Sequence, residues 1–215
     1  MKIAIIGTGA LGSSLAINYA ANKKKVNIWN RTAINVGKLS DLNNCSNQKR
    51  PFINFLKYCN IKNSVEEVVQ GSTTVLICIN AQSVHVFLRK YSHFLRSKTV
   101  VFCSKGIDTK SLLLQTEIGE KFLEQKQLAV LTGPGFSADI IRQKPIALTL
   151  ACLNEKTGKT IQDLLSTPSI RTYLSSDIIG AQIGGSLKNV IAIACGITEA
   201  RGLGDSAKIA VMTRG

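Results

Sequence analysis

Short runs of consecutive apolar residues recur along the first 150 positions of the chain. The runs Thr74 to Ile79 and Thr99 to Cys103 lack the polar alternation of a strand with one solvated face. Unbroken apolar runs of this length are typical of strands buried on both faces of a parallel sheet. Four further segments share this character and are predicted as strands: 2–6, 26–29, 128–131 and 146–150.

Segments with helical length or periodicity separate these runs. Leu15, Ala16, Tyr19 and Ala20 form an apolar helical pattern after the first run, and 81–95 and 157–165 are further predicted helices. Strands that alternate with helices indicate a doubly wound α/β fold with a mostly parallel sheet.

The pattern changes after residue 177. Residues 178–197 are apolar and rich in small side chains, with Lys188 as the only charge. The length permits a membrane span, but a lysine near the centre costs about 2.5–3.5 kcal/mol on insertion, and Gly184-Gly185 weakens a continuous helix. We therefore expect a buried helix rather than an integral membrane segment. The predicted domains are 1–177 and 178–215, the second being the incomplete start of a helical domain.

Composition excludes several classes of protein. The chain has 215 residues, 45% of them hydrophobic, which excludes intrinsic disorder. Its six cysteines are at least 14 positions apart, so no CxxC pair for zinc or redox chemistry is present and we expect no metal site. Lys2 and an apolar strand follow Met1 directly, without a signal peptide. A reducing cytoplasm is the expected compartment.

The formal net charge is +14, and residues 1–65 hold ten Lys and Arg against the single acid Asp41. Nucleic-acid binding is one interpretation of such a charge. However, 23–25 (KKK) follow the predicted first helix, whose dipole they complement. Aromatic residues are not interleaved with the basic ones as a single-strand groove requires. We therefore expect anionic small molecules, and no nucleic acid, as partners.

A glycine motif, residues 7–12 (GTGALG), lies between the first strand and the first helix. In this context Gly7 permits a tight turn, Gly9 lets the backbone approach a pyrophosphate, and Gly12 allows close packing of helix on strand. The helix N-terminus adds free N–H groups and partial positive charge. The motif predicts dinucleotide binding.

The end of the second strand bears on which dinucleotide is bound. NAD sites place an acid about twenty residues after the motif to bind the ribose hydroxyls. This chain has Asn30 and Arg31 there, and no acid before Asp41. Because an arginine would pair with a 2′-phosphate, we favour NADP over NAD; the other interpretation of Arg31 is a solvated loop charge.

Further candidates for chemistry follow the later strands. Lys105 and the turn at 133–135 (GPG) come after predicted strands, at the sheet edge where open α/β folds bind ligands. Lys188 is a candidate acid–base group if burial lowers its pKa, or else a lysine whose ammonium reaches water. His85 and His93 lie in one predicted helix without a nucleophile motif nearby, and we interpret both as structural.

Four segments together carry a specific resemblance: GTGALG at 7–12, CSKGID at 103–108, LTGPGFSADI at 131–140 and the last 33 residues from IGGSLKNVIAIACG to MTRG. In this order they resemble bacterial NAD(P)-dependent glycerol-3-phosphate dehydrogenase. The resemblance implies a Rossmann-like domain followed by an all-helical substrate domain. It also implies reduction of dihydroxyacetone phosphate to sn-glycerol 3-phosphate for glycerophospholipid synthesis.

The resemblance also implies roles for individual residues. Ala10, Leu11 and Arg31 match positions that contact the dinucleotide. Lys105 matches a lysine shared by cofactor and substrate, and Lys188 matches the proton donor and acceptor.

Two positions within residues 131–140, Gly135 and Ser137, depart from the family pattern. Gly133 matches a substrate-side backbone position, whereas Gly135 stands where the family has Ser or Thr. Ser137 replaces an alanine near the cofactor.

The family chain also continues beyond residues 213–215 (TRG), into a part that carries further substrate-binding groups. We therefore expect a fragment or a truncated product.

Two alternatives remain open from the sequence. One is another Rossmann dehydrogenase, of the 2-hydroxyacid or 6-phosphogluconate type. The other is a non-catalytic dinucleotide-binding remnant. Either is compatible with a monomer or a homodimer.

Overall fold

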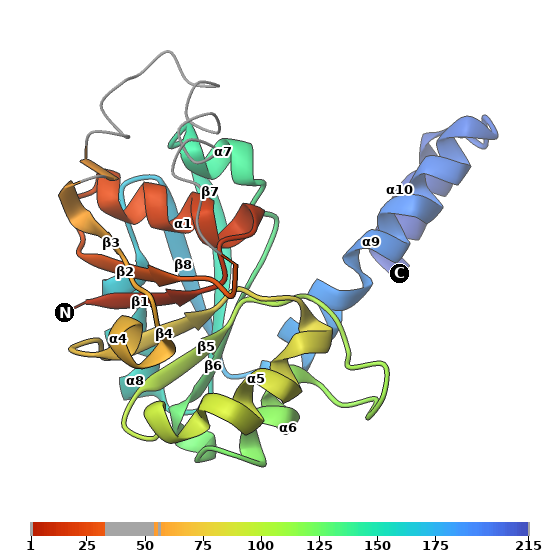
Figure 1. The fold of residues 1–215 in the computed structure, drawn as a ribbon. Coiled ribbons are helices and arrows are strands. Elements are labelled where there is room, and N and C mark those ends of the chain that lie inside the picture. Colours follow the sequence, from red (N-terminus) through yellow and green to blue (C-terminus); the bar gives the residue numbers. More distant parts are fainter. Residues whose placement is uncertain (1, 33–53, 56, 215) are drawn as a thin grey trace.

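The computed structural model describes residues 2–32, 54–55 and 57–214. Its centre is an eight-stranded sheet of order β3-β2-β1-β4-β5-β6-β7-β8 (Figure 1). The strands are β1 (Ile3–Ile6), β2 (Val26–Trp29), β3 (Cys59–Ile61), β4 (Thr74–Ile77), β5 (Thr99–Phe102), β6 (Leu128–Thr132), β7 (Ile146–Cys152) and β8 (Ile170–Ser175).

The direction of the strands divides the sheet into two parts. The strands from β3 to β6 are all parallel, so their carboxyl ends meet at one edge. β7 pairs with β6 in the antiparallel sense, and β8 is parallel to β7. The last two strands therefore run back toward the opposite edge. The prediction of a Rossmann-like, mostly parallel sheet is confirmed.

Helices cover both faces of the sheet. They are α1 (Ala10–Ala21), α4 (Val65–Val69), α5 (Val84–Tyr91), α6 (Gln115–Glu120), α7 (Ser137–Ile141), α8 (Glu155–Leu165), α9 (Ile178–Ala200) and α10 (Gly204–Arg214), with 3₁₀ turns η1 (Ala81–Ser83), η2 (Ser92–Phe94) and η3 (Gln125–Gln127). α1, α7 and α8 pack on one face and α4, α5 and α6 on the other.

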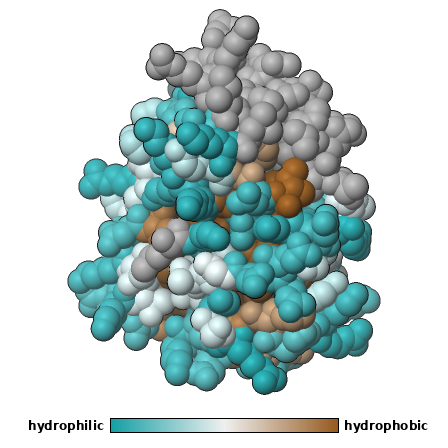
Figure 2. Space-filling view, turned by 60° about the vertical axis from the view of Figure 1, so that its left-hand side comes forward, coloured by the Kyte–Doolittle hydropathy of each residue, from teal (hydrophilic) through white to brown (hydrophobic). Residues whose placement is uncertain are grey.

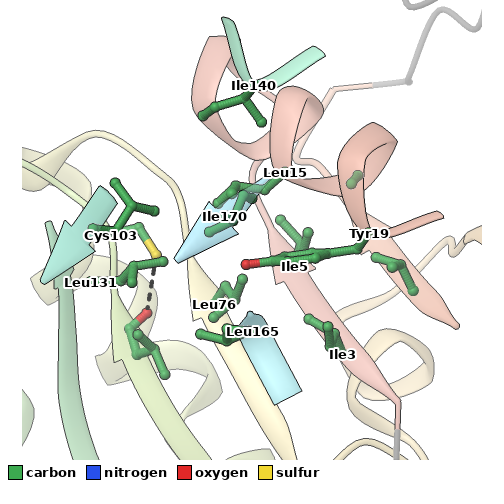
Figure 3. Packing of buried hydrophobic residues seen from close by; sticks show 14 of the residues in the cluster. Ile3, Ile5, Leu15, Tyr19, Leu76, Cys103, Leu131, Ile140, Leu165 and Ile170 are labelled. Carbon is green, nitrogen blue, oxygen red and sulfur yellow. Dashed lines mark hydrogen bonds between the residues drawn. The ribbon is translucent and has the colours of Figure 1, made fainter. Parts of the chain in front are cut away.

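The alternation of side chains along each strand supplies both cores. Ile3 and Ile5 of β1 face α1, whereas Ala4 and Ile6 face the opposite layer. All four are completely buried, as the apolar run predicted. Figure 3 shows the α1 side of this core, where Tyr19 lies across the strands with its hydroxyl directed toward the side on which Cys103 lies.

Several elements differ from the sequence prediction. β3 and β8 were not predicted, because β3 has three residues and Arg171 and Tyr173 of β8 are exposed, which interrupts the apolar run. The predicted helix 81–95 consists of η1, α5 and η2 in succession. The strand predicted to reach Ile79 ends at Ile77, and the predicted helix at 157 begins two residues earlier, at Glu155.

The prediction of a helix over 178–197 is confirmed, but the expectation that this helix is buried is wrong. Ile178 and Gln182 are the buried residues of α9, and Val190, Ile193 and Ile197 are more than half exposed. The reason is geometric, because α9 passes the carboxyl edge of the sheet and continues beyond it with α10 beside it (Figure 1). By length and hydropathy α9 is the one described helix that could cross a membrane, and a single such helix is weak evidence.

The basic residues have more than one structural role. Hydrophilic side chains dominate the face shown in Figure 2. Lys24, expected to complement the dipole of α1, instead donates to carbonyls at the end of α8: its Nζ lies 2.6 Å from Leu164 O and 2.7 Å from Ser166 O. Asp41 and Cys45 lie outside the described residues.

Candidate active site

The glycine turn joins β1 to α1 at the carboxyl edge of the sheet. Gly7 has φ +98°, and a Cβ there would lie 2.7 Å from the carbonyl oxygen of Cys78. A Cβ on Gly12 would lie 2.0 Å from the carbonyl oxygen of Gly7, whereas one on Gly9 would meet nothing within 4 Å. Gly7 and Gly12 are therefore required by the turn itself, and Gly9 leaves open space for a ligand at the start of α1.

A cavity of about 610 Å³ opens in front of this turn. Gly7 and Gly9 form one side of it, and Asn30 and Arg31 follow β2 on another. The Oδ1 of Asn30 accepts a hydrogen bond from the backbone N–H of Thr8 at 3.4 Å, which ties the end of β2 to the glycine turn. Arg31 is exposed at the cavity wall.

Aromatic residues close the far side of the cavity. Trp29 of β2 meets Tyr91 of α5 in an edge-on arrangement with ring centroids 6.0 Å apart. The ring of Phe87 lies 5.2 Å from that of Tyr91. With Lys90, these α5 side chains form a wall that combines flat apolar surface and positive charge. Such a wall suits an aromatic ring that carries phosphate.

The loop after β5 brings Lys105 to the same edge. Two side-chain amides, one buried and one exposed, fix this loop: Gln115 Nε2 donates to Gly106 O at 2.8 Å, and Gln82 Nε2 donates to Ile107 O at 2.8 Å. Gly106 has φ +135°, which a residue with a side chain rarely adopts. The Nζ of Lys105 donates to the carbonyl of Gly133 at 3.1 Å. The loop therefore holds its lysine against the turn that follows β6.

A second cavity, of about 330 Å³, lies between that turn and α9. Lys105 and Gly133 line it from the sheet, and Gly184, Gly185 and Lys188 line it from α9. A Cβ on Gly185 would lie 2.6 Å from Thr132 Oγ1, so glycine is what allows α9 to pass so close to the end of β6.

Electrostatics couples the two lysines of the second cavity. Lys105 is exposed as a whole residue, but partial desolvation of its ammonium lowers its pKa, and the charge of Lys188 lowers it further. Lys188 itself is half-buried, with its Nζ 4.7 Å from the centre of the Phe136 ring. Two ammonium groups in one small cavity favour a ligand that carries negative charge.

The features of the first cavity fit a dinucleotide. The φ of Gly7, the contact of Gly12 with Gly7 and the open space at Gly9 are what a pyrophosphate at a helix N-terminus needs. The residues at the second cavity can attract an anion and supply a proton from an ammonium group.

Comparison with known proteins agrees with this geometry. Residues 2–158 match the model of the NAD-dependent glycerol-3-phosphate dehydrogenase N-terminus, and residues 177–215 match that of its C-terminus. The chain belongs to the NAD-dependent glycerol-3-phosphate dehydrogenase family.

Individual relatives give the extent of the likeness. The chain is 37% identical, over its whole length, to the glycerol-3-phosphate dehydrogenase [NAD(P)+] of Roseobacter denitrificans, of which it covers 66%. It is 36% identical to that of Paramagnetospirillum magneticum and covers 78% of it. Glycerol-3-phosphate dehydrogenase of Coxiella burnetii superimposes with a TM-score of 0.80 at 24% identity, over 99% of this chain and 65% of that one.

Most residues that the sequence singled out come together at the carboxyl edge. Gly7 and Gly9 with Arg31 line the first cavity, and Lys105 with Gly133 and Lys188 lines the second. Ala10 is exposed and Leu11 half-buried in the first turn of α1. These placements are compatible with the roles that the glycerol-3-phosphate dehydrogenase family implies.

Other candidate residues lie apart from the cavity linings. Gly135 and Ser137 are half-buried in the segment that follows Gly133, and neither is among the residues that line the two cavities. His85 stacks near Phe122 and His93 near Phe94, and both are exposed. Lys188 is half-buried rather than buried, because the part of α9 that carries it lies beyond the sheet.

Sequence reasoning missed residues that position the site. Gln182, buried in α9, accepts from the backbone N–H of Thr116 at 3.1 Å and donates to the Thr116 hydroxyl at 2.8 Å. It thereby fixes α9 to α6, six residues before Lys188. The sequence holds a weak signal of this role, because a polar side chain within an apolar helical segment needs a hydrogen-bond partner when it is buried. The amphipathic pattern of α5 could likewise have indicated which of its side chains face the sheet.

Proposed function

We propose that this chain carries the dinucleotide site and the acid–base lysine of an enzyme that reduces dihydroxyacetone phosphate to sn-glycerol 3-phosphate with NAD(P)H. The observation that carries the proposal is the pair Lys105 and Lys188 in one cavity, next to a glycine turn shaped for a pyrophosphate. The names of the relatives support the same reaction.

Each part of the proposed site has a task. Gly7, Gly9, Ala10, Leu11 and Gly12 would hold the pyrophosphate and its surroundings, with Arg31, Lys105 and Ser137 as further cofactor contacts. Lys105, Gly133, Gly135 and Lys188 would hold the substrate. In terms of domains, we propose that 1–177 bind the dinucleotide and that 178–215 begin the substrate-binding part.

Reduction of a ketone requires a proton donor beside the oxygen on which negative charge develops. The residues around the glycine turn would hold the dinucleotide, which would supply a hydride for the ketone carbon. Lys188 then protonates the developing alkoxide oxygen, and Lys105 stabilises negative charge on the same side. The contact of Lys105 with Gly133 O keeps its ammonium at the cavity before substrate arrives.

The same arrangement bears on the choice of dinucleotide. Among the described residues that line the first cavity there is no Asp or Glu, and Arg31 is exposed beside Asn30. We propose a preference for NADP, because a guanidinium pairs well with a 2′-phosphate. Replacing Arg31 with Ala should weaken NADPH binding more than NADH binding; an equal loss of both would refute this role.

Turnover of NADPH with dihydroxyacetone phosphate tests the main proposal. Lys188→Met should lower the rate about 10²- to 10⁴-fold, the usual contribution of a positioned acid. NADPH affinity, measured by nucleotide fluorescence, should change little, and Lys110→Met, an exposed lysine outside both cavities, should behave as the parent chain.

The outcomes separate the alternatives. Undiminished turnover in Lys188→Met would refute the role of that lysine. NADPH binding by the parent chain without turnover of any ketone would favour the non-catalytic binding protein. Turnover of a 2-hydroxyacid in preference to the phosphate ester would favour another dehydrogenase. The cytoplasm remains the proposed compartment.

A further inference from the structure

Two cysteines meet beneath the glycine turn. Ile77 of β4 is paired with Phe102 of β5, so Cys78 and Cys103, each one position further, are neighbours across the same ladder. The ladder continues there, because the N–H of Cys103 donates to Ile77 O at 3.0 Å. Both side chains belong to the α1 side of the sheet, where the Cys103 thiol donates to Val101 O at 3.7 Å.

The two thiols differ in access. Cys78 is half-buried and lines the first cavity, whereas Cys103 is 2% exposed and is not among the residues that line it. The neighbouring Cys78 thiol and burial together raise the pKa of Cys103 well above its ordinary value. An oxidant that enters the cavity therefore meets Cys78 first, and Cys103 is a protected second thiol.

Cys78 also touches the turn that shapes the dinucleotide site. Its carbonyl oxygen is the atom that a Cβ on Gly7 would meet at 2.7 Å, and its Cβ is 3.1 Å from where a Cβ on Gly12 would be. Any movement of Cys78 toward β5 therefore changes the contacts of two of the three glycines.

The spacing of the pair suits a disulfide. Neighbouring strands lie about 4.8 Å apart, and bridged cysteines have Cα atoms about 4.4–6.8 Å apart. The cysteines within described strands are Cys59 of β3 and Cys152 of β7, and neither strand is adjacent to β4 or β5.

A buried donor beside the pair has no hydrogen-bond partner in the part of the chain that the structure describes. The hydroxyl of Tyr19 is completely buried, and burial, followed by the two thiols, raises its pKa. Buried hydroxyls are rarely left unpaired. A sulfenate oxygen or a thiolate on the neighbouring sulfurs would accept from this hydroxyl.

We propose that Cys78 and Cys103 form a reversible disulfide under peroxide, and that this bond weakens dinucleotide binding; the second part rests on the proposed function. Peroxide first oxidises the Cys78 thiol to a sulfenic acid and releases one water. The Cys103 sulfur then attacks the Cys78 sulfur, the S–S bond forms, and a second water leaves. The two thiols thereby give up two electrons and two hydrogens to the peroxide, and a dithiol reductant reverses the change.

Peptide analysis tests the bond without reference to any dinucleotide. Trypsin cuts after Lys62, Arg89, Lys98 and Lys105, which leaves Cys78 alone in peptide 63–89 and Cys103 alone in peptide 99–105. After peroxide and alkylation of the remaining thiols, the two peptides should appear linked. The link should vanish in Cys78→Ala and in Cys103→Ser but persist in Cys152→Ser, the matched control.

Two results would overturn the bond. One is recovery of both peptides separately alkylated from a chain whose circular dichroism shows it folded. The other is a link from Cys78 to a different cysteine. Should Cys103→Ser fail to fold, Cys78→Ala keeps the test open, because its side chain is partly exposed at the cavity.

NADPH binding tests the consequence. The reduced chain should bind NADPH, the oxidised chain roughly tenfold more weakly, and dithiothreitol should restore the first value. By reciprocity, saturating NADPH should slow formation of the link. Equal affinity in both states would refute the coupling, whereas a reduced chain that binds no dinucleotide would refute the proposed function and leave the disulfide standing.

Discussion

The three glycines of the turn differ in what a methyl group would encounter. On Gly12 it would be forced against the carbonyl of Gly7, and on Gly9 it would meet open space. The clash at Gly12 therefore arises within the folded chain itself, with no ligand present. The second position matters when something occupies the space in front of α1.

Gly12→Ala should therefore lower the free energy of unfolding by about 1–3 kcal/mol, the cost of overpacking, and abolish dinucleotide binding. Gly9→Ala should leave stability within about 0.5 kcal/mol and weaken only the binding. Chemical denaturation and NADPH titration of both variants measure this. Gly196→Ala, where a Cβ meets nothing within 4 Å, is the control. Equal destabilisation by the first two variants would contradict the argument.

Lys105 offers a second prediction, in its pH dependence. Desolvation and the charge of Lys188 lower its pKa in the folded chain, so the unfolded chain binds more protons between that lowered pKa and the ordinary value of about 10.4. Stability contributed by this group consequently rises with pH through the window. Below this pH window Lys105 is protonated in both states, and its charge then lowers the free energy of unfolding by the full amount.

Lys188→Met removes the neighbouring charge and should move the pKa of Lys105 upward, toward its ordinary value. NMR titration of isotope-labelled lysines follows this directly, with Lys110→Met as the control for general effects. A pKa of Lys105 that is the same in Lys188→Met and in the parent chain would show that the two ammonium groups are not coupled.

Among the elements, α1 is held to the second half of the sheet by one polar side chain. Asn18 is completely buried; its Nδ2 donates to Ile140 O and to Ser169 Oγ, both at 3.0 Å, and its Oδ1 accepts from the Thr167 hydroxyl at 3.1 Å. These partners belong to α7 and to the turn before β8. One amide thus joins elements more than 120 residues apart in sequence.

Asn18→Ala should destabilise the fold by about 2–3 kcal/mol, because it leaves buried polar groups without partners. Asn22→Ala, at the residue that follows α1 and is only partly buried, should cost less than about 1 kcal/mol. Urea denaturation of both variants compares them. A cost for Asn18→Ala no greater than that for Asn22→Ala would contradict this account.

The elements also show how far the sequence could predict the structure. The apolar runs of β1, β4 and β5 and the glycine turn are local signals, and they are confirmed. β8 was missed because its exposed Arg171 and Tyr173 interrupt the apolar pattern. The partners of Gln182 and the neighbours Cys78 and Cys103 arise from strand order and helix packing, which no local pattern contains. The role of Lys188 stays a prediction, although its place beside Lys105 agrees with it.

At the scale of the whole molecule, α9 and α10 present apolar residues away from the sheet. Val190, Ile193 and Ile197 are 58%, 65% and 56% exposed and lie on one face of α9. The chain spans about two thirds of the length of its relatives (66% for the one from Roseobacter denitrificans). A contiguous exposed apolar surface promotes association.

The 215-residue chain should therefore self-associate as its concentration rises. Sedimentation velocity should show less association for Val190→Ser with Ile193→Ser than for the parent, while Asn189→Ser, an exposed polar change on the same helix, should leave it unaltered. A parent chain that remains monomeric at every concentration would refute this expectation.

The reversal of β7 and β8 has a consequence for the length of α9. Since β8 runs back, α9 starts beside the sheet, where Ile178 packs on Val130, two residues before the end of β6. The remaining strand is about 7 Å long, whereas ten helical residues advance about 15 Å before Lys188. Lys188 therefore lies beyond the end of β6. The direction of its side chain depends on the number of helical residues between Ile178 and Lys188. Deleting one of them would turn its side chain by about 100° around the helix axis, a larger change than most substitutions could make.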